Sequence, residues 1–208
     1  ITKVSENISK DIKSRIGDID DNRILSYLPL AHVFERAWVE CASMVDGKTH
    51  VYFAESLDTF VADLNRARPT TFISVPRLWL KFQQGVFAKM PPKKLNRLLG
   101  IPILSGIVKR KVLKNLGLDQ ALLAGSGSAP IPAELISWYR RLGLNMIEGY
   151  AMSEDFAYSH NSTPEINLPG CVGVPLPGVE VRISEEGEIL IKSPGQLVGY
   201  YKRPDLDA

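Results

Sequence analysis

Cysteines are scarce in this sequence. Cys41 and Cys171 form no CxxC pair, so the sequence indicates neither a disulfide framework nor a cysteine-based metal site. Such cysteine usage is typical of a reducing compartment. No signal peptide opens the chain, and no apolar run approaches the roughly 20 residues that a membrane-spanning helix needs. We therefore expect a soluble cytoplasmic protein.

Acidic residues are absent from one long segment, residues 64–118. The segment holds twelve of the 25 Lys and Arg residues, whereas all 23 Asp and Glu residues lie outside it. A basic block of this kind favours contact with anions such as phosphate, coenzyme A or an anionic membrane surface. The alternative, that several helices simply expose charged faces to water, remains open. We expect no nucleic-acid partner.

Helical and strand patterns alternate over most of the chain. Apolar spacing predicts helices at 1–17, 34–45, 57–68, 77–90, 105–116 and 132–142, and short apolar runs predict strands at 24–30, 50–54, 70–75, 121–124 and 145–148. Strands that alternate with helices are typical of parallel sheets. We therefore expect an α/β fold in which a parallel sheet is flanked by helices on both faces.

The pattern changes after about residue 165. Glycines and prolines crowd residues 169–178, and two alternating runs, 179–183 and 189–192, flank a turn at 185–187. This arrangement is typical of an antiparallel hairpin. We predict an α/β subdomain at 1–165 and the beginning of a small antiparallel β unit at 166–208.

Three polar turns follow predicted strands, and ligands of open parallel sheets bind outside the carboxyl ends of the strands. The first turn ends at His32. The second, at 125–130, is made of small residues that let backbone amides approach a ligand. The third, at 148–154, supplies an aromatic ring, a hydroxyl and a carboxylate. By itself, a glycine/serine turn is more often an ordinary turn, and a lone histidine is more often a capped or core residue, so the three motifs have to be considered together.

In this order, the motifs resemble those of the adenylate-forming superfamily and, within it, the long-chain acyl-CoA synthetases. The resemblance spans nearly the whole chain. It rests on six segments: SYLPLAHVFER (26–36), TTFISVPRLW (70–79), GSGSAP (125–130), EGYAMSE (148–154), GCVGVPLPGVEVRI (170–183) and GEILIKSPGQLVGYYKRPD (187–205).

The resemblance implies an ATP-dependent ligase for long-chain fatty acids. Members of this group convert a carboxylate and ATP into an acyl-adenylate and pyrophosphate, and then transfer the acyl group to coenzyme A. The resemblance also implies that residues 1–165 belong to an adenylation domain and that 166–208 begin a β-barrel-like subdomain. It implies nucleotide-binding roles for ten residues: Gly127, Ser128, Ala129, Pro130, Glu148, Gly149, Tyr150, Ala151, Met152 and Ser153.

Particular roles follow from the same resemblance. Tyr150 would stack on the adenine, because a flat ring suits a flat base. Ser153 would bond the α-phosphate, and Glu154 would bind Mg²⁺, which takes oxygen ligands at about 2.1 Å. His32 would lie beside the substrate carboxylate and the α-phosphate. We interpret His32, Ser153 and Glu154 as catalytic residues.

The acyl chain would lie in an apolar tunnel, part of it formed near Trp79 and residues 98–108. Each buried CH₂ group contributes about 0.8 kcal/mol, so tunnel length would set the chain preference. The basic helices within 81–114 would rest on an anionic membrane that holds fatty acid.

The sequence departs from the family pattern in two ways. Ala151 stands where a glycine is usual and Ser153 where a threonine is usual; serine keeps the hydroxyl. More importantly, the sequence contains no Ser/Thr/Gly-rich phosphate loop ending in Pro-Lys-Gly, no Thr-Gly-Asp segment and no lid domain with its lysine. Because positioning and electrostatic stabilisation supply most of the rate, we expect these 208 residues alone not to catalyse adenylation.

Other functions compete with this interpretation. A ligase for an aryl, amino or medium-chain acid belongs to the same superfamily, and a catalytically dead binding or scaffold module would share the motifs. A nicotinamide-dependent oxidoreductase is disfavoured because no strand is followed by GxGxxG. A serine hydrolase is disfavoured because residues 125–129 do not spell G-x-S-x-G.

Overall fold

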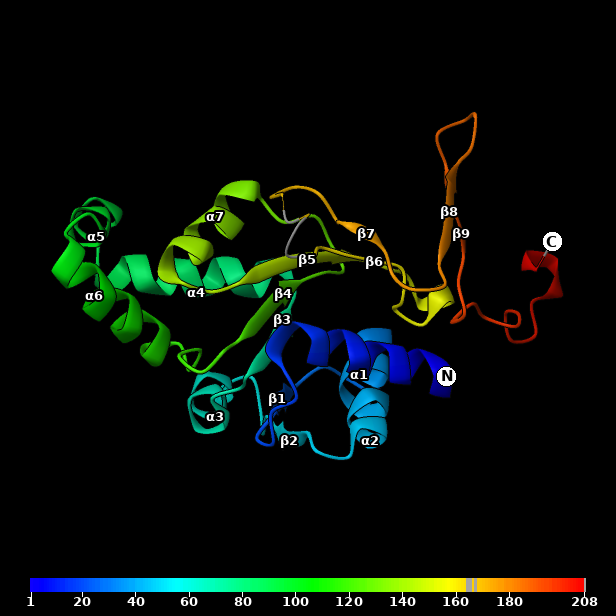
Figure 1. Cartoon of the computed structure of the whole chain (residues 1–208), viewed down its shortest axis with the longest axis horizontal. Coiled ribbons are helices and arrows are strands. Elements are labelled where there is room, and N and C mark those ends of the chain that lie inside the picture. Colours follow the sequence, from blue (N-terminus) through cyan, green and yellow to red (C-terminus); the bar gives the residue numbers. More distant parts are fainter. Residues whose placement is uncertain (164–165, 167, 208) are drawn as a thin grey trace.

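The strands form three sheets in the residues that the computed structural model describes, 1–163, 166 and 168–207 (Figure 1). The small parallel sheet consists of β1 (Arg23–Ser26) and β2 (His50–Phe53). The five-stranded sheet has the order β3-β4-β5-β6-β7, in which β3, β4 and β5 are parallel and β6 and β7 continue it in the antiparallel sense. An antiparallel hairpin follows. The bounds are β3 (Thr71–Ser74), β4 (Leu123–Ser126), β5 (Met146–Tyr150), β6 (His160–Asn161), β7 (Val174–Pro175), β8 (Glu180–Ile183) and β9 (Ile189–Lys192).

These sheets confirm the predicted α/β fold, with one difference: the parallel strands are divided between two sheets. Where β1 approaches β3, the Thr70 N–H donates to the Arg23 carbonyl (2.9 Å) and the Arg23 N–H donates to the Thr70 hydroxyl oxygen (2.8 Å). A side-chain oxygen, rather than a backbone carbonyl, thus receives the Arg23 N–H. No regular ladder continues from this point, because a ladder needs backbone partners on both strands.

The helices lie close to their predicted positions. They are α1 (Thr2–Ile16), α2 (Ala42–Asp46), α3 (Phe60–Ala67), α4 (Pro76–Lys89), α5 (Pro92–Leu99), α6 (Pro102–Asn115) and α7 (Ala133–Leu142), together with the π-helix η1 (Glu35–Cys41) and the 3-10 turns η2 (Ser153–Asp155) and η3 (Pro204–Leu206). Proline opens α4, α5 and α6, where its missing N–H costs no hydrogen bond. Helix α5 lies between the helices predicted at 77–90 and 105–116 and is not among the predicted helices. The helix predicted at 34–45 is η1 continued by α2.

Helices cover both faces of the five-stranded sheet, as predicted. In β3, Phe72 belongs to the larger core, which includes Trp79 of α4 and Tyr139 of α7. Its neighbour Ile73 packs instead against the second core, which includes Ile8 of α1. Successive side chains of a strand point to opposite faces, so the two cores lie on opposite sides of the sheet. Figure 1 shows α4 and α7 on one side of β4 and β5 and α1 on the other.

The hairpin β8–β9 projects from the rest of the molecule (Figure 1), and it confirms the antiparallel unit expected there. Strand β7 follows residue 166 but belongs to the five-stranded sheet. The division into subdomains at 1–165 and 166–208 stays a prediction, and residues 164, 165, 167 and 208 lie outside the described part. Among the described residues, no helix combines the length and the apolarity that crossing a bilayer requires.

Candidate functional site

The three parallel strands of the larger sheet end at one edge. Ser74 is paired with Ser126, and Ser126 is paired with Glu148, so β3, β4 and β5 end side by side. The turns after β4 and β5 border an open cavity, which we call the strand-end cavity; its volume is about 550 Å³ when the open solvent at its mouth is included. The site residues predicted from the sequence that line it are His32, Gly127, Ser128, Gly149, Tyr150 and Ala151. Segments more than a hundred residues apart in sequence thus meet where the motif order predicts a ligand site.

The glycine/serine turn after β4 forms one wall of this cavity. A Cβ atom on Gly125 would lie 3.1 Å from Cγ1 of Ile73 and 3.3 Å from Cγ1 of Ile147, so the flanking strands leave little room for a side chain. Ser128 adopts φ of 67°, in the left-handed region. The buried hydroxyl of Ser126 lacks a hydrogen-bond partner among the described residues. Because buried hydroxyls are normally paired, Ser126 is a candidate to bond a ligand in this cavity.

Tyr150, at the end of the neighbouring strand β5, forms another part of the wall. It is paired with His160 of β6, and the two ring centroids lie 5.9 Å apart. A Cβ atom on Gly149 would lie 3.3 Å from the His160 carbonyl oxygen and from Oδ1 of Asn161, so β6 packs closely on this glycine. The chain therefore offers an aromatic ring beside closely packed backbone, an arrangement that suits a flat ligand.

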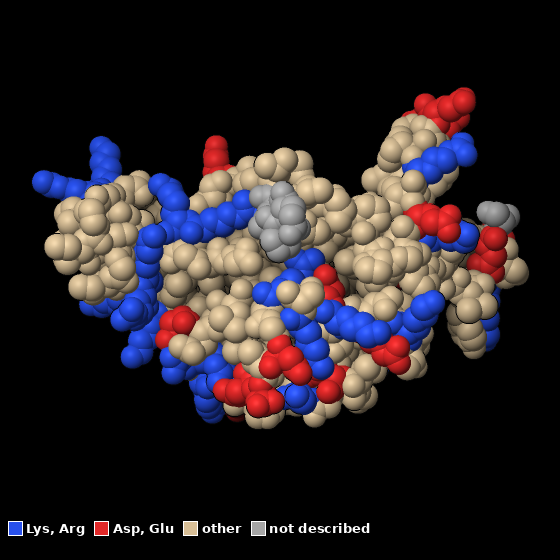
Figure 2. Space-filling model, viewed as in Figure 1, with Lys and Arg blue, Asp and Glu red and all other residues tan. Residues whose placement is uncertain are grey.

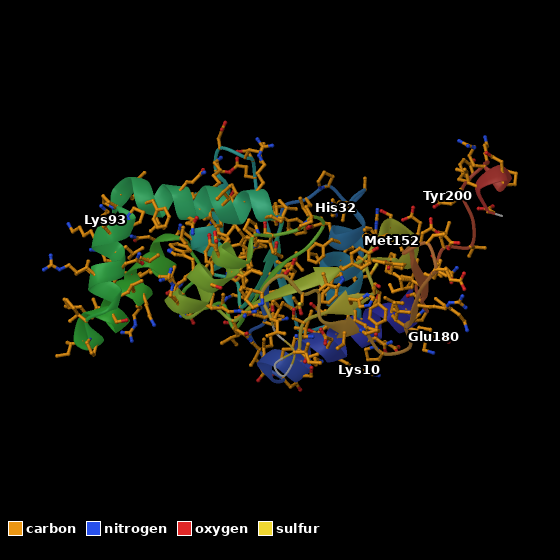
Figure 3. All side chains as sticks on the ribbon, turned by 90° about the horizontal axis from the view of Figure 1, so that it is seen from above. Lys10, His32, Lys93, Met152, Glu180 and Tyr200 are labelled. Atoms are coloured by element: carbon orange, nitrogen blue, oxygen red, sulfur yellow. The ribbon has the colours of Figure 1, made fainter. Side chains whose placement is uncertain are left out.

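His32 reaches the cavity from a loop after β1 (Figure 3). The Phe34 N–H donates to Nδ1 of His32 (3.2 Å), so the neutral ring carries its proton on Nε2. Beneath the loop, the fully buried Glu35 accepts a hydrogen bond from the Ser26 hydroxyl, and burial raises the pKa of Glu35. This packing fixes the loop, and His32 has an N–H to offer to an anionic oxygen.

Sequence reasoning does not identify several residues that line the cavity. Trp38 lies in η1, Phe34 directly precedes that helix, and His160 and Asn161 form β6. Burial lowers the pKa of His160, which favours its neutral ring at pH 7. A strand of two residues leaves no alternating pattern to detect. The nearest available signal is the position of His160 shortly after the 148–154 motif.

Six predicted site residues do not line the strand-end cavity: Ala129, Pro130, Glu148, Met152, Ser153 and Glu154. Ala129 and Pro130 are exposed on the outer side of their turn, and Glu148 is buried. After Ala151 the chain turns into η2, which carries Ser153 and Glu154 away from the cavity wall. The predicted nucleotide-binding and catalytic roles of these six residues therefore stay predictions.

Glu154 is engaged by the C-terminal segment. The Tyr200 hydroxyl donates to Oε1 of Glu154 (3.0 Å), and this bond raises the pKa of Tyr200. The Leu197 N–H donates to the Glu154 carbonyl (2.7 Å). The neighbouring Asp155 is buried, accepts the Met152 N–H (3.0 Å), and has a pKa raised by burial. Of the two carboxylates, Glu154 is therefore the accessible one.

The described residues contain no group of three His, Cys, Asp or Glu side chains that could hold a metal ion by themselves. Mg²⁺ is commonly held by one or two carboxylates together with substrate phosphates. The accessible carboxylate of Glu154 fits this limited role, in which the nucleotide supplies the other oxygen ligands.

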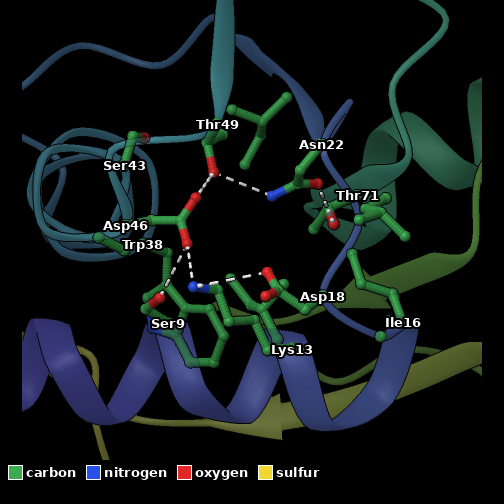
Figure 4. A pocket seen from close by; sticks show the side chains of 15 residues that line it. Ser9, Lys13, Ile16, Asp18, Asn22, Trp38, Ser43, Asp46, Thr49 and Thr71 are labelled. Carbon is green, nitrogen blue, oxygen red and sulfur yellow. Dashed lines mark hydrogen bonds and ion pairs between the residues drawn. The ribbon is translucent and has the colours of Figure 1, made fainter.

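A second, smaller cavity lies between α1, α2 and the small sheet (Figure 4). Its polar side chains satisfy one another: Lys13 Nζ lies 2.7 Å from Asp46 Oδ1, the Thr49 hydroxyl donates to Asp46 Oδ2 (2.7 Å), and Asn22 Nδ2 donates to Thr49 (3.0 Å). These contacts join α1 and α2 to the sheet. Because the groups are already paired with one another, none of them needs a ligand as a hydrogen-bond partner.

We expect Asp46→Asn to lower the free energy of unfolding by about 1–3 kcal/mol at pH 7, because charged hydrogen bonds are lost. Burial alone would raise the pKa of Asp46, but the hydrogen bonds from Lys13 and Thr49 outweigh it and lower the pKa. The stabilisation is therefore complete above the unfolded-state pKa near ~3.9 and is lost as the pH falls through the lower folded-state pKa. Urea unfolding at pH 7 and at low pH measures this difference.

The matched control is Asp20→Asn, since Asp20 is 96% exposed and lies 3.4 Å from Lys48. We expect this change to stay within about 0.5 kcal/mol of the parent chain. An equal effect of both substitutions would contradict a stabilising role for the Lys13–Asp46 pair.

The comparisons of this sequence with known proteins all point to one family of enzymes. A sequence profile described as AMP-binding enzyme matches residues 3–201. Long chain acyl-CoA synthetase 5 of Arabidopsis thaliana is 28% identical over 218 residues, covering 88% of this chain and 32% of the plant protein. Putative fatty-acid–CoA ligase fadD11 of Mycobacterium tuberculosis is 30% identical over 219 residues, covering 91% of this chain and 38% of that ligase. The chain thus spans about a third of the length of these relatives.

Solved structures agree with this picture. The A-PCP didomain of carboxylic acid reductase from Segniliparus rugosus, in complex with AMP, superimposes with a TM-score of 0.72 and 25% identity, covering 98% of this chain and 29% of that one. The N-terminal domain of FACL13 from Mycobacterium tuberculosis shares the fold, with a TM-score of 0.65 and 20% identity over 98% of this chain and 48% of that one. Together with the sequence matches, they confirm the resemblance drawn from the motifs.

Proposed function

The chain belongs to the family of AMP-binding enzymes, and on that premise we propose that a protein containing it activates a long-chain fatty acid with ATP and transfers the acyl group to coenzyme A. The observation that carries the proposal is the meeting of His32, the 125–130 turn and Tyr150 around one cavity at the ends of parallel strands. The relatives named as fatty acyl ligases support a fatty acid as the substrate. Membership of the AMP-binding family supports ATP as the second substrate.

The nucleotide would bind against the two turns. The face of the Tyr150 ring would stack on the adenine. Because Gly127 and Ser128 are small, the edge of the adenine could approach their backbone. A bare backbone is useful here because a side chain on either wall would fill the space that a purine needs. The hydroxyl of Ser153 would bond the α-phosphate, and this requires the segment after Ala151 to turn toward the cavity.

The chemistry consists of two displacements. First, an oxygen of the fatty acid carboxylate bonds to the α-phosphorus of ATP, and the bond from that phosphorus to pyrophosphate breaks. Next, the sulfur of coenzyme A bonds to the acyl carbon, the thiol loses its proton, and AMP departs. His32 would donate its Nε2–H to the oxygen on which charge develops, a stabilisation that grows toward the transition state.

Glu154 would hold Mg²⁺ through one oxygen, and the metal, when bound, neutralises charge on the phosphates. To do so, Glu154 would exchange its hydrogen bond with Tyr200 for the metal. The C-terminal segment that carries Tyr200 thus lies where it would sense nucleotide binding. We also propose that the protein acts in the cytoplasm.

The proposal is tested by ATP–pyrophosphate exchange with a panel of carboxylic acids. For a longer protein that contains this chain, we expect exchange with long-chain fatty acids to exceed that with aryl, amino and medium-chain acids. The 208 residues alone are expected to give no exchange, because they lack the Pro-Lys-Gly phosphate loop. Preference for another acid would assign a different ligase, and no exchange with any acid would favour a binding module.

A further inference from the structure

The end of the molecule formed by α5 and α6 carries an apolar cluster that the strand-end cavity does not use. Helix α6 exposes Ile103 (84% exposed) and Ile107 (63%), which lie one turn apart on the same face. Ile101 and Leu104 beside them are exposed as well. Figure 1 shows α5 and α6 at the opposite end of the molecule from the hairpin β8–β9. Exposed apolar side chains that lie next to one another are typical of an interaction surface.

The same end of the molecule is strongly basic (Figure 2). Nine cationic residues lie between positions 81 and 114 with no acidic residue among them, and within the described part of the chain none of the nine forms an ion pair or a side-chain hydrogen bond. The next acidic residue, Asp119, is already paired with Arg68 (2.5 Å). The nine are Lys81, Lys89, Lys93, Lys94, Arg97, Lys109, Arg110, Lys111 and Lys114. Their positive charge is thus available to an external anion.

We propose that this surface, the α5–α6 surface, docks on an anionic lipid bilayer. Ile103 and Ile107 enter the boundary between headgroups and acyl chains, and the surrounding cations bind lipid phosphates and carboxylates. Helices that lie in the plane of a membrane combine an apolar face with Lys and Arg in this way. The attraction of each cation to an anionic leaflet extends over about one Debye length, roughly 10 Å at 0.1 M salt.

The isoleucines distinguish a bilayer from a nucleic acid as the partner. Binding to nucleic acid uses cations on phosphates and, for single strands, aromatic rings that stack on bases. Residues 91–118 contain no aromatic side chain, and the exposed aliphatic side chains that α6 carries together with its cations have no counterpart in a phosphate backbone. The docking surface is separate from the strand-end cavity, so it does not depend on the proposed ligase activity.

The charge of the surface is tested by co-sedimentation of the 208-residue chain with vesicles. The vesicles contain either phosphatidylcholine alone or phosphatidylcholine with phosphatidylserine. We expect binding to the anionic vesicles, weakened at high salt, and at least a tenfold loss of partitioning when Lys93, Lys94 and Arg97 are all changed to Gln. The matched control changes Lys3, Lys10 and Arg141 to Gln, which removes the same charge from exposed positions elsewhere (Lys93 and Lys10 are labelled in Figure 3).

The apolar contact is tested separately by Ile103→Ser together with Ile107→Ser. We expect about a fivefold or larger loss of partitioning, whereas Met44→Ser with Leu57→Ser, at exposed positions outside α5 and α6, retains it. In addition, Ile103→Trp is expected to be quenched by vesicles with brominated acyl chains, and Leu57→Trp is not. All of these positions are exposed, so the fold is retained and circular dichroism verifies it.

Three results would overturn the proposal. They are equal binding to neutral and anionic vesicles, equal losses in the target and control variants, and tight binding to an oligonucleotide that the isoleucine changes leave untouched. The last result would assign the basic surface to nucleic acid. If a longer protein that contains this chain has no ligase activity while vesicle binding is intact, only the proposed function is overturned.

Discussion

Glu154→Gln is expected to lower the rate of ATP–pyrophosphate exchange at least about a hundredfold in an active protein that contains this chain. The substitution keeps the size of the side chain and removes its charge, so the proposed Mg²⁺ ligand is lost with little change in packing. Removal of a single group that stabilises developing charge costs about 10²–10³ in rate. The measurement is exchange at saturating ATP, repeated over a range of Mg²⁺ concentrations.

Tyr200→Phe is the matched control for this experiment. It removes the hydroxyl that donates to Glu154 but leaves the carboxylate in place. We expect it to change the rate by less than about threefold, since one solvent-exposed hydrogen bond contributes little. Unchanged exchange in the Glu154 variant would exclude the metal-binding role and would favour a scaffold without catalysis.

Trp79→Ala is expected to destabilise the chain by about 3–5 kcal/mol, the usual cost of deleting a buried indole. Trp79 is fully buried, and its ring packs at an angle on Phe72 and Tyr139, with centroids 5.4 and 4.8 Å away. Its Nε1–H donates to the Gly125 carbonyl (3.0 Å), at the start of the glycine/serine turn. Thermal unfolding measures the loss, and we expect the cavity wall to loosen with it.

A pair of Trp→Phe substitutions separates the hydrogen bond from the packing. In Trp79→Phe the Gly125 carbonyl loses its donor, whereas the Nε1–H of the equally buried Trp138 has no hydrogen-bond partner among the described residues. We expect Trp79→Phe to cost about 1–2 kcal/mol more than Trp138→Phe. Equal costs would mean that the bond to Gly125 contributes nothing and that only volume matters.

The local patterns of the sequence determined most of the secondary structure. Ile8 and Ile12 mark the buried face of α1, Gly47 and Gly143 end helices with positive φ, and prolines open α4 and α6. These are properties of neighbouring residues, which act within a turn or two of the chain. The alternating runs around Gly187 predicted the hairpin for the same reason. The family motifs are also local, and the AMP-binding match confirms what they indicated.

Only the tertiary structure decided how these elements combine. Where β1 approaches the larger sheet, Arg23 donates its N–H to the hydroxyl of Thr70, which lies 47 residues away in the sequence. The two-residue strand β6 exists because β5 and β7 hold it on either side, and it brings His160 to the cavity. Glu154 accepts a hydrogen bond from Tyr200, which lies 46 residues further along the sequence. Such contacts depend on how distant segments pack, and sequence periodicity carries no information about them. Residue types and their order thus indicated the family and its motifs, whereas packing chose which side chains face the cavity.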